Sequence, residues 1–453
     1  MPRDRRYLIG ICLTQGCLIS SITSFVTSIA AISADLHVTP QVAAIAGSAY
    51  GIAFGGLSIY APTGRKWLGA SFILAIGAAV WIIASIALLL SNDISIFVAA
   101  RFIQGTAAAI LAPCLVVVLR DERGPKFFDF MPIWGIVSPV GALIGVVGSA
   151  FSIWAGDWRF AQYALSLAMI AATLSIFCGR RIVATPEDAP SLPLHAILFP
   201  MLIIALYAAL SFGAWDMKQS AILACLLCFG LAVLFCVSES RQVSRKVFGI
   251  EVLCPSGHLT ATLWLLVSPG ILSCFFFVIS PFTESQFQTP EKFLAFVLPF
   301  GAALIGTSLL AERWDRGQTD SSRLNMAAYV MASAFLLSAW QTQAVERLWV
   351  ISALGVTCGA AISVVFSVTT KRYFTLVPKN AAEKSGVVCN MAFEIGPAVA
   401  VPIYLMAVRG TLYLENGNMY FSFMDVLIFM STIVIATLPA ISLICRLYLK
   451  LER

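Results

Sequence analysis

The sequence predicts an all-α membrane protein that crosses the lipid bilayer many times. Hydrophobic residues make up 59% of its 453 residues and charged residues only 11%, whereas a soluble domain carries about 25% charged residues. Apolar runs long enough to cross a membrane recur along the chain, and Lys and Arg gather in alternate connections between them. This composition excludes a soluble globular enzyme, a disordered protein, a coiled coil and a nucleic-acid-binding protein, which need a more highly charged surface.

Each apolar run is expected to form one transmembrane helix, because about 20 mostly apolar residues cross the hydrocarbon core as a helix. Fourteen such runs are present, at residues 8–32, 42–62, 67–91, 95–119, 128–151, 160–179, 194–214, 220–238, 259–281, 293–311, 324–340, 348–369, 386–408 and 421–445. The first run is long and lacks a small-residue cleavage site. We therefore expect it to remain as a membrane helix rather than to be removed as a signal peptide.

Positive residues predict the orientation of these helices. If the N-terminus is cytoplasmic and each run crosses once, most of the 29 Lys and Arg residues fall on the cytoplasmic side. The outside connections then hold only Arg159, Lys218, Lys292, Arg347 and Arg409. This asymmetry follows the positive-inside rule, so both termini are expected in the cytoplasm. The longest polar connections are cytoplasmic as well, and the short outside loops leave no room for a catalytic domain there.

The 12 cysteines do not predict disulfides or a metal site. Most lie inside apolar runs, where cysteine acts as a small, polarizable packing residue. The pair Cys225 and Cys228 has metal-ligand spacing but no His or acid beside it, which argues against a metal or redox role. We expect no cofactor and no metal ion.

Two cytoplasmic loops share a basic, glycine-containing pattern. The first follows the second run and ends in Gly64-Arg65-Lys66, and the other follows the tenth run and contains Asp315-Arg316-Gly317. Small residues let neighbouring helices approach closely, and a basic tight turn caps the pair at the cytoplasmic face. These segments resemble the major facilitator superfamily, whose signature G-x-L-A-D-R-x-G-R-K is repeated in degenerate form in the second half. The resemblance implies that both loops are gate elements.

Two further segments resemble motifs of the same family. Arg101-Phe102-Ile103-Gln104-Gly105 in the fourth run fits its R-x-x-Q-G motif. The fifth run contains Ser138-Pro139-Val140-Gly141, a degenerate form of the antiporter motif G-P-x-x-G-G, and Asp157-Trp158-Arg159-Phe160 follows it as W-R-x-x-F does in the family. The resemblance implies that Pro139 and Gly141 belong to a structural motif whose tight packing limits leak.

The number of runs implies a domain organisation. Fourteen runs resemble the fourteen-helix drug:proton antiporters of this superfamily, which insert two helices between two six-helix bundles. We therefore expect an N-terminal six-helix bundle at residues 1–185, two inserted transmembrane helices with their cytoplasmic linkers at 186–255, and a C-terminal six-helix bundle at 256–453. In this architecture the substrate site lies between the two bundles near the bilayer midplane.

One departure from this group concerns acidic residues. Ser21 occupies the position of an acid that is usual in the first helix of these antiporters, and Ala61 stands where the loop signature has its aspartate. Glu394, by contrast, lies about 12 Å along its predicted helix, near the midplane of a core ~30 Å thick. A carboxyl group at that depth is costly to ionise, so we expect it to take up protons near neutral pH. Glu394 is a candidate site for proton or cation coupling, or for binding a cationic substrate.

Other polar groups at membrane depth are candidate substrate contacts. Burying Arg101 costs about 2.5–3.5 kcal/mol even on a lenient insertion scale, so it is expected to face a cavity or a partner. The uncharged candidates are Asn390, Gln104, Gln15 and Tyr50. Each of these residues also has a structural interpretation: Asn390 as a hydrogen-bond partner of Glu394, Arg101 as a hub between the first and fourth helices, Tyr50 through helix packing, and the others through interhelical hydrogen bonds.

The sequence thus predicts a secondary-active transporter that exports a small amphipathic compound (a drug, metabolite or siderophore) in exchange for protons, by alternating access. An importer or an uncoupled facilitator is the alternative that the missing acids favour. A non-transporting membrane sensor or scaffold is an alternative of another class, and no residue cluster predicts a membrane enzyme. The expected partners are the substrate, protons and the lipid bilayer, with no nucleic acid. The resemblance implies a bacterial inner-membrane location, and we expect a monomer.

Overall fold

A computed structural model describes most of the first half of the chain and parts of the second. The described residues are 3–123, 127–179, 194–214, 217–241, 290–314 and 382–407, with shorter stretches at 262–267, 269–270, 273–274, 349, 352–353, 355–364, 373, 413–415 and 418–420. They are helical apart from turns and one antiparallel hairpin, β1 (Tyr413–Glu415) and β2 (Asn418–Tyr420), in which Tyr413 pairs with Tyr420. Within these residues, seven helices are long and apolar enough to cross a membrane.

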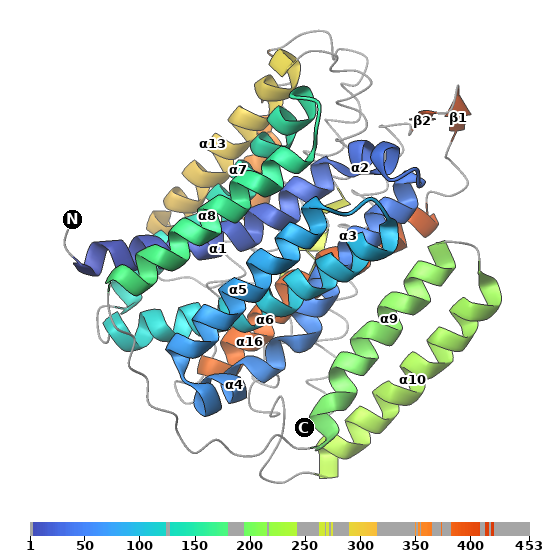
Figure 1. The fold of residues 1–453 in the computed structure, drawn as a ribbon, viewed down its shortest axis with the longest axis horizontal. Helices are drawn as coiled ribbons and strands as arrows, with labels where there is room; N and C mark the ends of the chain where they lie inside the picture. Colours follow the sequence, from blue (N-terminus) through green and yellow to red (C-terminus); the bar gives the residue numbers. More distant parts are fainter. Residues whose placement is uncertain are drawn as a thin grey trace.

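Helices α1 to α8, which we call the first-half helices, follow the first six predicted runs (Figure 1). They are α1 (Arg3–Thr27), α2 (Ile29–Asp35), α3 (Pro40–Leu57), the 3₁₀ helix η1 (Ser58–Tyr60), α4 (Ala61–Leu68), α5 (Ala70–Leu89), α6 (Ile94–Arg123), α7 (Phe127–Trp154) and α8 (Arg159–Gly179). One continuous helix was expected for each run. The structure differs at two places: the first run is divided at Ser28, and the second is divided by η1.

The break at Ser28 has a local cause. The hydroxyl groups of Thr23, Ser24 and Thr27 donate to carbonyl oxygens three or four residues earlier on α1, and such back-bonding weakens and bends helices. The amide of Ser28 then donates to the carbonyl of Phe25 at 3.0 Å, which is a tighter turn than α-helical spacing. The helix restarts directly afterwards as α2.

The later helices cover fewer of the predicted runs. They are the 3₁₀ helix η3 (Leu194–Ile197), α9 (Leu198–Ala214), α10 (Lys218–Arg241), α13 (Pro290–Trp314) and α16 (Ala382–Ala407). Helices α9 and α10 occupy the position of the predicted inserted pair. Residues 262–267 and 355–364 are helical parts of two further runs. The runs at 324–340 and 421–445 lie outside the described residues, so the count of fourteen remains a prediction.

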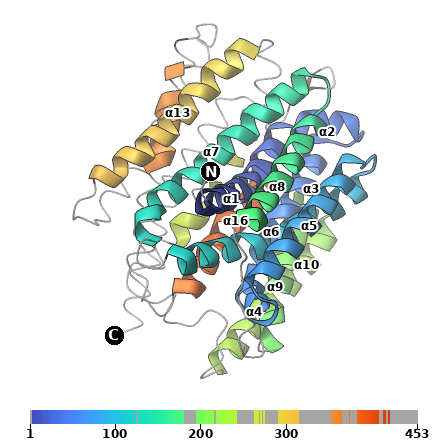
Figure 2. The same cartoon turned by 60° about the vertical axis from the view of Figure 1, so that its left-hand side comes forward.

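Two groups of contacts organise these helices. Helix α1 packs against α7 and α8, while α6 packs against α3 and α5. Helices from later in the chain meet this group at two separate places: α16 packs along α3, and α13 along α7 (Figure 2). We call the first of these contacts the α3–α16 seam. Helix α9 packs against both members of this seam, and α10 packs on α9.

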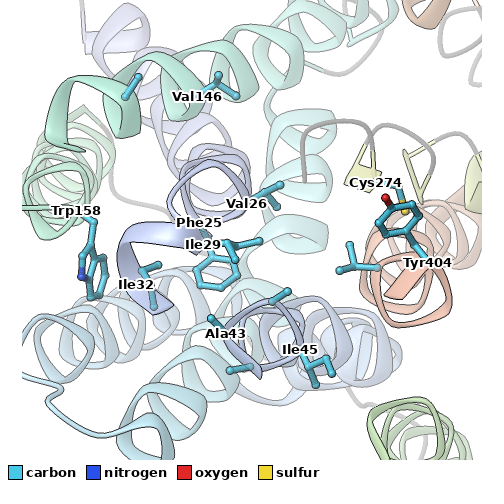
Figure 3. Close-up of a cluster of buried hydrophobic side chains, with 14 of the residues drawn as sticks. Phe25, Val26, Ile29, Ile32, Ala43, Ile45, Val146, Trp158, Cys274 and Tyr404 are labelled. Carbon is cyan, nitrogen blue, oxygen red and sulfur yellow. The ribbon is translucent and has the colours of Figure 1, made fainter. Parts of the chain in front are cut away.

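A large apolar cluster lies where α1, α2 and α3 meet (Figure 3). Phe25, Ile29 and Ile32 face α3 within it, and all three side chains are buried. The ring of Phe25 lies 5.5 Å from that of Phe97, which in turn lies 6.0 Å from that of Trp158. Because lipid tails are as apolar as these side chains, dense packing rather than transfer from water holds such helices together.

Helix α10 presents a different kind of surface. Many of its apolar side chains are exposed, including Leu223, Leu226, Leu227, Phe229 and Leu234. In a chain that spans a bilayer, such a surface contacts lipid tails without penalty. Among the described residues, α10 is therefore attached to the other helices through α9, and its exposed apolar side suits contact with lipid.

Candidate functional site

A buried arginine on α6 joins several of the first-half helices. Arg101 is 1% exposed. Its Nη1 donates to Ser21 Oγ at 3.0 Å, to Ser21 O at 3.5 Å and to Gln104 Oε1 at 3.1 Å. Its guanidinium carbon lies 5.0 Å from the ring centre of Phe25 and 4.6 Å from that of Tyr50, distances at which an aromatic face attracts a cation. Each of these partners is uncharged.

Further hydrogen bonds fix the groups around Arg101. Gln104 Nε2 donates to Ser85 Oγ of α5 at 2.7 Å, and Tyr50 Oη of α3 donates to the carbonyl of Leu18 on α1 at 3.3 Å. Hydrogen bonds are stronger in a low-dielectric interior, and a connected network makes the side chains rigid. Helices α1, α3, α5 and α6 thus all contribute groups that hold the guanidinium in place.

Glu394 approaches this network from α16. It is 5% exposed, and it interacts electrostatically with Arg101 and Tyr50. Its backbone carbonyl lies against Gly51, the residue that follows Tyr50 on α3. Among the described residues, Glu394 forms no ion pair and no hydrogen bond. The α3–α16 seam therefore brings an acid from late in the chain beside the arginine of the first-half helices.

The structure brings four of the predicted site residues together and leaves two apart. Glu394, Arg101, Gln104 and Tyr50 are linked by the contacts above. Asn390 is half-buried one turn before Glu394, and within the described part of the chain the two share no hydrogen bond. Gln15 is 7% exposed on α1, and its Oε1 has no hydrogen-bond partner among the described residues.

Two residues of this network were not predicted as partners of Arg101. Ser21 was noted only for the acid it replaces, yet it accepts two of the three hydrogen bonds from the guanidinium. Phe25 lies one turn further along α1, and the spacing of Ser21 and Phe25 on one helical face is the signal that links them. The site offers one buried cation, one buried acid, hydroxyl groups and aromatic faces, which suit ion and proton binding. Within the described ranges, no three His, Cys, Asp or Glu side chains gather as metal ligands.

The first loop motif forms the short helix α4. Gly64 and Arg65 lie on it and are half-buried, and it ends where the amide of Gly69 donates to the carbonyl of Arg65 at 2.8 Å. Helix α4 contacts α5 and α6 and also touches α16, which places this loop beside both early and late helices. The side chain of Lys66 and the whole second motif, Asp315-Arg316-Gly317, lie outside the described residues.

The motif of the fifth run packs α7 tightly against α1. Ser20 Oγ donates to the carbonyl of Gly141 at 2.7 Å, and a Cβ added at Gly141 would lie 2.8 Å from the carbonyl oxygen of Gly16. Thr23 Oγ1 donates to the carbonyl of Ala142 at 3.0 Å. Pro139 is half-buried on the same helix. Small residues and interhelical hydroxyl bonds of this kind are how helices approach closely in a bilayer.

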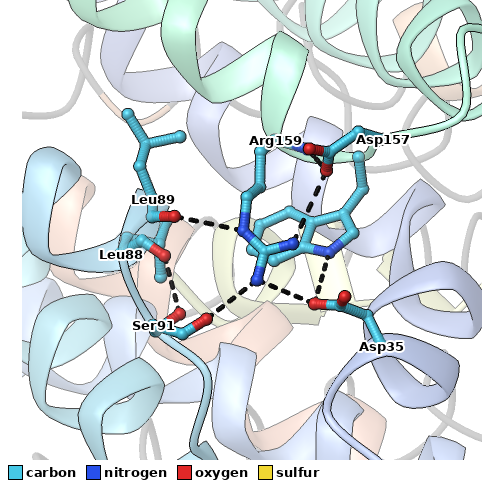
Figure 4. Close-up of polar contacts among 7 residues, drawn as sticks. Asp35, Leu88, Leu89, Ser91, Asp157 and Arg159 are labelled. Carbon is cyan, nitrogen blue, oxygen red and sulfur yellow. Dashed lines mark hydrogen bonds and ion pairs between the residues drawn. The ribbon is translucent and has the colours of Figure 1, made fainter.

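A second polar cluster joins three helix ends on the predicted outer face (Figure 4). Arg159 Nη2 lies 2.8 Å from Asp35 Oδ2, at the end of α2, and also donates to the carbonyl of Ser91 at 2.8 Å. Arg159 Nε donates to the carbonyl of Leu89, at the end of α5, at 3.1 Å. Trp158 Nε1 donates to Asp35 Oδ2 at 3.2 Å. The Trp-Arg pair of the W-R-x-x-F segment thus binds α8 to the ends of α2 and α5.

Sequence comparison finds weakly similar relatives in Mycobacterium tuberculosis. One, named as a probable multidrug-efflux transporter, is 23% identical over 283 residues, which cover 60% of this chain and 57% of the relative. Another, EfpA, named as an uncharacterized MFS-type transporter, is 24% identical over 279 residues, which cover 59% of this chain and 52% of the relative. The chain thus spans a little over half the length of the curated relatives it matches.

The fold resembles that of solved membrane transporters. The POT family transporter PepTSo superposes with a TM-score of 0.65 over 98% of both chains, at 12% sequence identity. An identity this low supports a common fold alone. The family model of the Major Facilitator Superfamily matches residues 11–401, which is most of the sequence. With this match, the loop and span motifs and the helical fold, the chain belongs to the major facilitator superfamily of membrane transporters.

Proposed function

We propose that this protein exports a small amphipathic compound in exchange for protons. The observation that carries the proposal is the position of Glu394, a carboxyl group that is 5% exposed at the α3–α16 seam and faces the charge of Arg101. An acid at membrane depth is costly and by default functional. The relative named as a multidrug-efflux transporter supports the outward direction.

In the proposed cycle, Glu394 gains and loses the transported proton. The ionised carboxylate attracts Arg101 across the α3–α16 seam, and the protonated carboxyl does not, because Coulomb attraction requires both charges. Protonation therefore weakens the contact between α16 and the first-half helices and favours a state in which they separate. A proton drives a conformational change only by binding one state better than the other, as this arrangement allows.

The moving parts are proposed to follow the predicted division of the chain. Residues 1–185 and 256–453 form two bundles that rock against each other, and residues 186–255 carry the inserted pair. This division is supported by the two separate places at which α13 and α16 meet the first-half helices. The loops at 61–68 and 312–323 act as cytoplasmic gate elements, and the packing of Pro139 and Gly141 limits leak.

Substrate contacts are proposed for the polar and aromatic groups around the seam. Arg101, Gln104 and Tyr50 lie within one network, whose aromatic faces suit the apolar part of an amphipathic molecule. Gln15 contributes a buried carbonyl oxygen that has no hydrogen-bond partner among the described residues. Asn390 is half-buried one turn from Glu394. The protein is proposed to act as a monomer in the cytoplasmic membrane of a bacterium, with both termini inside.

Transport in inverted membrane vesicles tests this function. Native protein and Glu394→Gln are compared on lipophilic cations and chelator-type acids, with and without an imposed pH gradient. Native flux should follow the gradient, and the variant should lose this dependence. Asp93→Asn is the matched control, because it makes the same acid-to-amide change at an exposed position. Gradient-driven transport at the native rate by Glu394→Gln contradicts the proposed role of the carboxyl group.

An uncoupled facilitator or importer is the second candidate. Neutral residues at two positions favour it: Ser21 is 0% exposed beside Arg101, and Ala61 is 3% exposed at the start of α4. It predicts flux that ignores the gradient in both native protein and Glu394→Gln, or net movement into the cell. A sensor or scaffold, the candidate of another class, predicts no flux of any tested compound.

A further inference from the structure

The two buried charges at the α3–α16 seam attract each other without forming a pair. All three hydrogen bonds of Arg101 leave from Nη1, and they reach Ser21 on α1 and Gln104 on its own helix. Its Nε has no hydrogen-bond partner in the described part of the chain. Because the hydrogen bonds hold one nitrogen only, a weaker hold on α1 lets the guanidinium turn toward Glu394.

Among the described residues, Arg101 is the positively charged side chain that interacts with Glu394. Helix α6 contributes Arg101, and α3 contributes the phenol of Tyr50. From α9, Tyr207 lies near the seam and donates its hydroxyl to the carbonyl of Ile45. The segment 262–267, which also packs against α16, holds no ionisable side chain. Helix α4 and η1, which also touch α16, carry Arg65 and Tyr60, and Tyr373 shares a cluster with Cys389. Among these groups, Arg101 is the charge that acts on Glu394.

We propose that Ser21 is a positioning residue for proton coupling: it holds the Arg101 guanidinium against α1 and so prevents it from closing on Glu394 as an ion pair. This inference rests on the proposed function of Glu394. A direct ion pair would keep the carboxyl ionised, since an adjacent opposite charge shifts proton affinity by about 1–3 pH units. With no counter-charge, burial would keep it protonated. An attracted but unpaired carboxyl can gain and lose a proton.

Ser21 is suited to this task by its size and its burial. It is 0% exposed, and its hydroxyl oxygen lies 3.0 Å from Arg101 Nη1. A serine accepts a hydrogen bond without adding charge, so it fixes the guanidinium and leaves its positive charge uncompensated. An acid at the same position would fix the guanidinium and neutralise it. Substitutions at residue 21 can therefore separate the fixing of the guanidinium from the neutralisation of its charge.

Infrared titration of the Glu394 carboxyl group tests the proposal without requiring a known substrate. The band of the protonated carboxyl is identified as the one that Glu394→Gln lacks, and it is followed against pH in lipid vesicles. In Ser21→Ala, Nη1 keeps the backbone carbonyl of residue 21 and Gln104 as acceptors but loses the 3.0 Å hydroxyl bond. The guanidinium should therefore move toward Glu394, and the midpoint of the carboxyl titration should move about one pH unit toward acid. In Ser21→Asp, the guanidinium is neutralised, and the midpoint should move toward alkali. The acid shift in Ser21→Ala is the expected signature, because this variant adds no charge and a purely structural role predicts no shift; Ser21→Asp shows the sign expected when the guanidinium is neutralised.

Ser166→Ala is the matched control for the loss of a buried hydroxyl group. Ser166 is 7% exposed, and its hydroxyl donates to Gln162 O on its own helix, away from Arg101. In Ser166→Ala, the midpoint of the Glu394 titration should equal that of the native protein. A Ser21→Ala titration midpoint equal to that of the native protein, with both proteins folded by size-exclusion chromatography, overturns the inference whatever Ser21→Asp shows. If the midpoints shift as expected while vesicle flux ignores the gradient, positioning by Ser21 stands and the proposed antiport fails.

Discussion

The carbonyl oxygen of Glu394 lies so close to Gly51 that a Cβ added to this glycine would come within 2.9 Å of it. The contact joins the backbones of α3 and α16 directly beside Tyr50, whose ring covers Arg101. The side chain of Glu394 therefore approaches the arginine from a helix whose backbone is in contact with α3. Any increase in the spacing of these helices moves the acid away from its counter-charge.

Gly51→Ala tests this spacing. The new methyl group must push against backbone, which cannot rotate aside, so we expect a loss of about 1–3 kcal/mol of stability and weaker coupling of transport to the pH gradient. Thermal unfolding in detergent measures the first effect and vesicle flux the second. Gly148→Ala is the control, because a Cβ there meets no atom within 4 Å. An unchanged unfolding temperature in Gly51→Ala contradicts the close approach.

Tyr207→Phe tests how firmly α9 is attached to α3. The phenol hydroxyl of Tyr207 on α9 donates to the carbonyl of Ile45 on α3. Removing this bond should lower stability by about 0.5–1.5 kcal/mol and should raise the rate of proteolysis in the linkers around α9 and α10. The same change at Tyr163, whose side chain is 46% exposed, should have no measurable effect. Equal stability of the two variants shows that the hydroxyl bond contributes nothing.

A double-mutant cycle between Asp35 and Arg159 measures the strength of the outer cluster. Their side chains are 38% and 15% exposed, so solvent screens part of the attraction. We expect Asp35→Asn and Arg159→Gln to show a coupling free energy of about 0.5–1 kcal/mol. Added salt should reduce it, because exposed charges are screened. Additive effects on the unfolding temperature would contradict a direct interaction.

Arg101→Gln and Arg101→Lys separate the charge of the guanidinium from its shape. Glutamine removes the positive charge, so the Glu394 carboxyl should remain protonated to higher pH and flux should no longer respond to the gradient. Lysine keeps the charge but lacks the planar fork that fits between Ser21, Gln104 and the two rings. The lysine variant should retain a gradient response at a reduced rate. Gradient-driven flux in Arg101→Gln would remove Arg101 from the coupling mechanism.

The sequence predicted the position of the described helices better than it predicted the contacts between them. Apolar runs and positive loops mark helices because the bilayer imposes their length and orientation. Arg101 and Glu394 stood out because buried charges are costly. The role of Ser21 could not be inferred, because serine is common in membrane helices and one hydroxyl carries no sign of its partner. The break at Ser28 arises from several weak hydroxyl bonds acting together, which no single motif encodes.

The location of α9 was also beyond prediction from the sequence. Its apolar side chains suit lipid and protein surfaces equally, because both are hydrocarbon. Hydropathy therefore marks α9 as a membrane helix but does not say which helices it touches. Contacts made through Ile203 and Tyr207 are visible only in the assembled fold. The same reasoning explains why the contact between α3 and α16, distant in sequence, needed the structure.

The two kinds of contact made by the inserted pair have a consequence for its motion. Tyr60 donates to the carbonyl of Ala196 at 3.2 Å, and Tyr207 donates to that of Ile45, so hydroxyl bonds fasten the start and the middle of the η3–α9 segment to the helices of the second run. Toward α16 it offers Ile203, which shares an apolar cluster with Met391 and Ile395. A hydrogen bond must break before its partners separate, whereas apolar surfaces can slide and re-form their contacts. During transport, we therefore expect α9 to move together with α3 and α16 to slide along the surface of α9.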